Sequence, residues 1–117
     1  MSLQAYHKAQ RSAESPRDTE YRLFAQVTQA LIEANKQGRT NLPQFVDALD
    51  WNRRLWSALA TDCAAQGNGL PDALKAQIIS LSLWVSRFSS DAAGSDESLE
   101  PLIDVNRSIM AGLSQKP

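Results

Sequence analysis

The side chains that most often do chemistry in proteins are sparse in this sequence. His7 is its single histidine and Cys63 its single cysteine. Acid–base and nucleophilic catalysis need such groups paired within hydrogen-bond reach, and a zinc site needs about four ligands of these types. We therefore interpret His7 as a solvated surface residue. Cys63 lies on an apolar helical stripe and is expected to be a buried, inert thiol.

Carboxylates and glycines offer no alternative chemistry. The carboxylates are scattered and do not follow the Asp/Asn/Gly spacing of a calcium loop. The Gly67-Asn68-Gly69 stretch lacks the Lys-Ser/Thr that follows in a phosphate-binding loop. The sequence thus predicts a protein that is not an enzyme and that holds no metal and no cofactor.

Tryptophan and arginine point instead to recognition of a partner. Trp51 and Trp56 are five positions apart on one predicted helix, about 140° around it, so both cannot point into one core. Because tryptophan and arginine are enriched at binding hot spots, these residues and their neighbours are predicted to bind a partner. The alternatives are core packing of the tryptophans and a solvated charged face. The predicted partner-binding residues are Trp51, Arg53, Arg54, Trp56, Trp84 and Arg87.

A short pattern occurs twice. Residues 49–56 and 103–110 both read apolar-Asp-apolar-Asn-Arg-x-apolar-apolar. Asp50 and Asp104 each precede an arginine by three positions, so each pair can meet on a helix face. Asn52 and Asn106 fall inside apolar stripes, where an unpaired amide costs about 1–3 kcal/mol. We expect the two amides to bond each other or facing backbone and to set helix register; a role in binding is the alternative.

Glycine and proline divide the chain into five predicted helical segments. Ser15-Pro16 and Asn41-Leu42-Pro43-Gln44 have the residue types of helix starts. Apolar residues then recur at threes and fours, as in Phe24, Val27, Leu31 and Ala34. The segments are expected at about 2–13, 16–38, 41–67, 71–88 and 98–113, with a loop from Ser89 to Ser98. The predicted fold is all-α: one domain over residues 1–117, an antiparallel bundle of four main helices plus a short N-terminal helix.

Composition limits the class of protein. Of 117 residues, 43% are apolar and 21% charged, and the formal net charge is −1. The composition is too apolar for an intrinsically disordered protein. The chain also lacks the net positive charge that would let it bind nucleic acid as its sole partner. No run of about 20 apolar residues could span a membrane, and the polar first ten residues do not resemble a secretory signal. One cysteine fits a reducing compartment, so a cytoplasmic location is expected.

The third and fourth predicted helices carry more apolar surface than a minimal bundle hides. Val46, Trp51 and Leu55 widen the stripe of the third helix, and Ile79, Leu83 and Trp84 widen that of the fourth. An exposed apolar surface on a monomer usually marks a partner site. We therefore expect an amphipathic partner helix to bind there.

Five stretches together resemble the FlaF family, small flagellar biosynthesis regulators of alphaproteobacteria. The most specific element is Trp51-Asn52-Arg53-Arg54-Leu55-Trp56, which lies within the stretch of residues 48–56. The resemblance covers nearly the whole chain, from Leu3 to Leu113. The other stretches are residues 5–6, 15–20, 79–87 and 101–107.

The resemblance implies a cytoplasmic factor that binds flagellin as an export chaperone and promotes flagellin synthesis and secretion. Flagellin's terminal segments are amphipathic helices that are disordered before assembly, which matches the partner expected from periodicity. The alternative is a post-transcriptional regulator that acts through FlbT, a regulator of flagellin mRNA translation, or on that mRNA. Direct RNA binding is not expected at this net charge, and the resemblance implies no catalytic residues.

Overall fold

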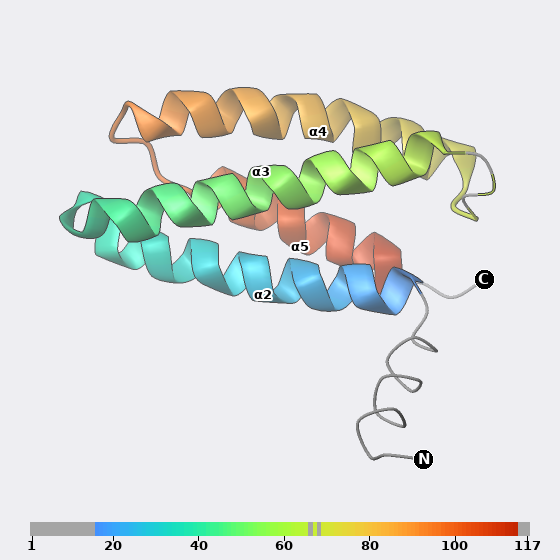
Figure 1. Ribbon diagram of the computed structural model, residues 1–117, viewed down its shortest axis with the longest axis horizontal. Coiled ribbons are helices and arrows are strands. Elements are labelled where there is room, and N and C mark those ends of the chain that lie inside the picture. Colours follow the sequence, from blue (N-terminus) through green and yellow to red (C-terminus); the bar gives the residue numbers. More distant parts are fainter. Residues whose placement is uncertain (1–15, 66, 68, 115–117) are drawn as a thin grey trace, which may run out of the picture.

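Helices make up almost all of the described chain in the computed structural model (Figure 1). The structure describes residues 16–65, 67 and 69–114. Within these ranges it contains no strand, so the predicted all-α class is confirmed for this part of the chain. The short helix predicted over about 2–13 lies outside the described residues. The described elements are α2 (Pro16–Gln37), a 3-10 helix η1 (Gly38–Asn41), α3 (Leu42–Ala64), α4 (Asp72–Ala93) and α5 (Glu100–Ser114).

The junction between α2 and α3 follows the predicted signals in part. Gly38 has a φ of 59°, a left-handed conformation that favours glycine, directly after α2 ends. Asn41 is the N-cap of α3, and its Oδ1 accepts a hydrogen bond from the Gln44 backbone N–H at 3.3 Å. The reciprocal bond of a capping box is not formed, because Gln44 Oε1 is buried without a hydrogen-bond partner.

Consecutive helices run antiparallel, and α3 lies between α2 and α4 in Figure 1. Helix α3 packs along both of these neighbours, and α5 packs along α2. By contrast, α4 and α5 touch only sparsely. The bundle is therefore loosely closed on the side between α4 and α5, and α4 depends mainly on α3 for its packing.

The core consists of the predicted apolar stripes. Phe24, Val27 and Leu31 of α2 are completely buried, and Phe24 meets Trp56 edge to face with ring centroids 5.3 Å apart. Other completely buried large apolar side chains are Phe45, Ile78, Val85, Leu99 and Leu102. The 3.6-residue periodicity in the sequence thus identified the faces that pack inward.

Helix α4 extends further than the sequence predicted. The loop expected from Ser89 to Ser98 begins only after Ala93. Ser89 Oγ donates to the Val85 carbonyl at 2.7 Å, and Ser90 Oγ donates to the Ser86 carbonyl at 3.1 Å. Serine is a weak loop signal when its hydroxyl can bond back to the preceding helical turn in this way.

Arg39 of η1 holds the end of α4. Its Nη2 donates to the carbonyl of Ala92 at 2.8 Å and to that of Ser95, and its Nη1 donates to the Glu97 carbonyl at 3.4 Å. The guanidinium also lies over the Phe45 ring, 3.9 Å from its centroid. One side chain therefore satisfies carbonyl groups at the C-terminus of α4 and fixes the start of the α4–α5 connection.

Candidate partner-binding surface

Three of the residues selected from the sequence form a hydrogen-bonded network inside the core. Asn106 Oδ1 accepts from Trp56 Nε1 at 2.8 Å, and Asn106 Nδ2 donates to Asn52 Oδ1 at 2.8 Å and to Thr28 Oγ1 at 3.1 Å. Asn52, Asn106 and Trp56 have no exposed surface. The two asparagines thus bond each other, the first of the arrangements expected from the repeated pattern. Asn52 Nδ2 is buried without a partner.

The network corrects the prediction for Trp56. Its indole is completely buried against Phe24 and uses its N–H inside the core. A side chain in this position cannot contact a partner, so its inclusion in the binding surface was wrong. The sequence pattern placed two tryptophans on different sides of one helix. This pattern required only that one of them lie outside the core, and the structure shows that this one is Trp51.

Asp50 lies at the surface between two arginines. Its Oδ1 is 2.9 Å from Arg53 Nη2 and its Oδ2 is 2.9 Å from Arg54 Nη2. The arginine side chains are 48% and 78% exposed, so these ion pairs contribute little to stability. The cluster carries one net positive charge. Asp104, the equivalent residue of the second pattern, is exposed on α5 and forms no ion pair within the described part of the chain, although the spacing allows one.

Large apolar side chains remain exposed on three sides of the bundle. Trp51 is 42% exposed and Trp84 36% exposed, but they lie on different helices, and Trp51 lines a pocket to which Trp84 does not contribute. The predicted partner-binding residues therefore do not form one surface. The exposed large apolar residues are Tyr21, Leu42, Val46, Trp51, Ile79, Leu83 and Trp84.

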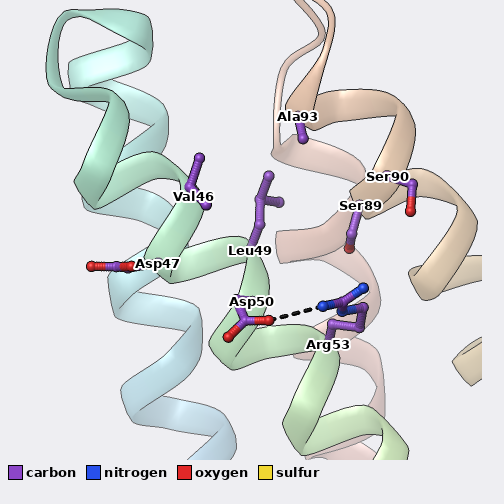
Figure 2. Close-up of a pocket in the computed structure, with 8 residues that line it drawn as sticks. All are labelled: Val46, Asp47, Leu49, Asp50, Arg53, Ser89, Ser90 and Ala93. Atoms are coloured by element: carbon purple, nitrogen blue, oxygen red, sulfur yellow. Dashed lines mark hydrogen bonds and ion pairs between the residues drawn. The ribbon is translucent and has the colours of Figure 1, made fainter.

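One surface follows the junction of α3 and α4 and contains a pocket of about 300 Å³ (Figure 2). Val46 and Leu49 of α3 face Ala93 of α4 across it, and Arg53 extends toward α4 from the adjacent turn (Figure 2). Leu42, Val46, Ile79 and Leu83, together with this pocket, are called the α3–α4 surface below. The pocket is lined by Val46, Asp47, Leu49, Asp50, Arg53, Ser89, Ser90 and Ala93.

Trp51 belongs to a second surface, between α2 and α3. It lines a pocket of about 400 Å³ with Ala30 of α2 and with Gln44, Asp47 and Ala48 of its own helix. This pocket places one aromatic ring beside four polar or small side chains.

Trp84 belongs to the third surface, on the flank of α4 nearest to α5. Its ring contacts Phe88, with centroids 5.2 Å apart. Leu74 and Leu81 are partly buried on the same flank, and a Cβ on Gly112 of α5 would lie 3.7 Å from Leu74 Cδ1. Trp84 is thus partly covered by its own helix and lies where the bundle is loosely closed.

The polar chemistry of these surfaces is limited. Burial raises the pKa of the Cys63 thiol, helped by the Glu20 and Asp62 carboxylates and opposed by Lys75, so the thiol stays protonated. In the part of the chain that the structure describes, no three His, Cys, Asp or Glu side chains gather as ligands for a metal ion. Likewise, no described helix is both long and apolar enough to cross a bilayer.

Val46 and Leu83 are the residues that sequence reasoning undervalued. They were counted in the surplus apolar surface of the two helices but not among the predicted partner-binding residues, yet they are 45% and 61% exposed, both more than either exposed tryptophan. The spacing of Val46 off the buried stripe of α3 was the available signal. More weight was given to tryptophan and arginine as binding residues than to this spacing.

Comparison with known families gives one match. A family model described as "Flagellar protein FlaF" matches residues 2–113. No curated protein and no solved structure matches the chain.

Proposed function

The chain belongs to the FlaF family of flagellar proteins, and on that premise we propose that it is a non-enzymatic, cytoplasmic export chaperone that binds flagellin. In this role it keeps flagellin's amphipathic terminal helices from aggregating before secretion and so promotes flagellin synthesis and export. The family membership supports a flagellar role, and the exposed apolar side chains support binding of another protein as its mode of action.

The observation that carries the proposal is the apolar surface left exposed on α3 and α4. Leu83 is 61% exposed, Leu42 49% and Val46 45%. Covering a side chain of this size by about half contributes roughly 1 kcal/mol. Several such contacts favour an apolar partner that hides them together, as an amphipathic helix does.

A calorimetric titration with soluble, monomeric flagellin tests the proposal. We expect micromolar or tighter 1:1 binding with a negative heat-capacity change, the mark of apolar burial. Assembled flagellin filaments are the matched control and should not bind, because their terminal helices are already packed. Absence of binding to the monomer would contradict the proposal.

FlbT is the second candidate partner, because the same exposed apolar side chains suit any amphipathic helix. Binding of FlbT without binding of flagellin would place the protein in flagellin regulation rather than export. A gel-shift assay with flagellin leader RNA completes the comparison. We expect no shift by this protein alone, since a formal net charge of −1 offers no basic field.

A further inference from the structure

We propose that the α3–α4 surface, and not either exposed tryptophan, is the docking site, and that its occupant is an amphipathic helix with acidic residues along one edge. The inference rests on the proposed function, in which that helix is a terminal helix of flagellin. It deepens that function by naming the site and the chemistry of the helix that fits it.

The side chains of α4 that reach this surface form one continuous stripe. Ile79, Leu83 and Ser90 are separated by four and seven positions, so they lie on the same side of the helix. Ser90 lines the pocket at the α3–α4 junction. The two exposed apolar residues of the stripe, 39% and 61% exposed, therefore continue the pocket along α4.

Helix α3 supplies the opposite border. Leu42, Val46 and Arg53 are separated by four and seven positions and share one side of α3, and two of them line the pocket. Because the helices run antiparallel, Leu42 and Val46 lie near the C-terminal end of α4, while Ile79 lies toward the N-terminal end. Ala93 and Ile79 are 14 positions apart on α4, which corresponds to about 21 Å along the helix.

These dimensions suit a helix better than an extended peptide. A partner helix of about 14 residues lying along the junction covers this length. One of its apolar side chains enters the pocket beside Val46, and others, about seven and eleven positions away, pack on Leu83 and Ile79. Because the pocket and these two anchors are spaced by near-integral turns, one apolar stripe of a helix reaches all of them.

The charged residues around the α3–α4 surface indicate which charge the polar edge of the partner helix carries. Asp50 is shared by Arg53 and Arg54, which leaves this cluster one net positive charge. Arg87, one turn beyond Leu83 on α4, is exposed and forms no ion pair with any residue that the structure describes. Asp47 also lines the pocket but points away from the side that faces α4 (Figure 2). An acidic edge on the partner complements the unneutralised arginines.

The exposed tryptophans are weaker sites. Trp84 already stacks on Phe88, and Trp51 lines a pocket with Asp47 and Gln44 rather than with other large apolar residues. Neither surface has a second large apolar residue that is as exposed as Leu83.

Titration of soluble flagellin into surface variants tests the assignment. Leu83→Asp and Val46→Asp should each weaken binding about tenfold or more, equivalent to about 1.4 kcal/mol. Leu83→Met, which keeps the apolar contact, should bind like the wild type. Trp51→Asp is the matched control at an exposed apolar residue on another surface and should stay within about twofold. Circular dichroism checks that each variant keeps its helices, as expected for exposed positions.

A second pair of variants tests the charge. Arg87→Glu should weaken binding severalfold and reduce its dependence on salt. Arg107→Glu, at an exposed arginine of α5 without an ion pair, should leave both unchanged. An equal loss in the two variants would overturn the acidic-edge part of the inference.

The outcomes separate this inference from the proposed function. If wild-type protein does not bind flagellin, both the proposed function and the proposed docking site are wrong. If wild-type protein binds and both Asp variants of the α3–α4 surface bind equally well, the docking site alone is wrong. If sedimentation shows self-association that Leu83→Asp abolishes, the occupant is a second copy of this chain and the inference is overturned.

Discussion

Replacing each buried asparagine by alanine should have unequal effects, although both side chains are completely buried. Asn106 makes three hydrogen bonds, to Trp56, Asn52 and Thr28. Its removal leaves Trp56 Nε1–H and Asn52 Oδ1 buried without a hydrogen-bond partner. Each unpaired group lowers the free energy of unfolding by about 1–3 kcal/mol, so Asn106→Ala should cost roughly 4 kcal/mol. Thr28 keeps Met110 Sδ as an acceptor, 3.9 Å away.

The loss at Asn52 should be much smaller. Asn52→Ala breaks one hydrogen bond, and it also removes Nδ2, which has no partner in the native core. Asn106 still bonds Trp56 and Thr28 in this variant, but one of its amide N–H groups loses its acceptor. Removal of the unpaired Asn52 Nδ2 offsets this penalty in part, so the net cost should be about 1 kcal/mol. Both substitutions delete the same atoms from fully buried sites, so the cavity contributions are similar. The expected difference of about 3 kcal/mol therefore reports the hydrogen bonds.

Urea unfolding followed by far-ultraviolet circular dichroism measures this difference, with stability obtained by linear extrapolation. The double variant should be less destabilised than the sum of the two single variants, because the side chains contact each other. Losses that agree within about 0.5 kcal/mol would refute the reasoning, since Asn106 would then not be the hub of the network.

Three further changes have defined expectations. Arg39→Lys should lower the free energy of unfolding by about 1–3 kcal/mol, because one ammonium cannot reproduce the forked contacts to the Ala92, Ser95 and Glu97 carbonyls. Urea unfolding measures this loss of stability, and faster amide hydrogen exchange in the α4–α5 connection shows where it occurs. Asp50→Ala should cost about 1 kcal/mol or less in the same assay, because its arginine partners are exposed. Cys63 should react with a thiol reagent only after unfolding, because it is buried and its pKa is raised. Since the folded pKa exceeds the ordinary value of 9.0, the unfolded thiol ionises first, and this part of the stability is present below pH 9.0 and lost above it; Cys63→Ala should show a smaller decline over that range, and an equal decline would contradict the assignment.

Local sequence signals identified much of the fold. The stripe of Phe24, Val27 and Leu31 predicted a buried helix face, and the structure buries it completely. Asn41 was recognised as a cap, and it accepts the expected bond from Gln44 N–H. These features depend on residues three or four positions apart, so a single sequence contains them. The end of α4 was misplaced because the Ser89 and Ser90 hydroxyls bond within the helix instead of breaking it.

The candidate binding surface was only partly predictable. The excess of apolar residues on the third and fourth helices was visible in the sequence. Pairing of Asn52 with Asn106 was one of the arrangements that the sequence allowed, with bonds to facing backbone and a role in binding as the alternatives. The sequence did not show which of the excess apolar residues stay exposed. Trp56 is buried against Phe24 of another helix, while Leu83 remains exposed.

The sequence by itself therefore determined the helical class, the inward faces and the lack of a recognisable catalytic motif, because periodicity, caps and residue types are local properties. Tertiary structure alone decided that α4 packs mainly on α3, that Arg39 reaches the end of α4, and that Val46 lines a pocket with Ser90 and Ala93 of α4. A helix with apolar residues on two sides can bury either side, and the choice depends on which neighbours the rest of the chain brings against it. In this protein α3 covers one side of α4, and Leu83 on another side stays 61% exposed.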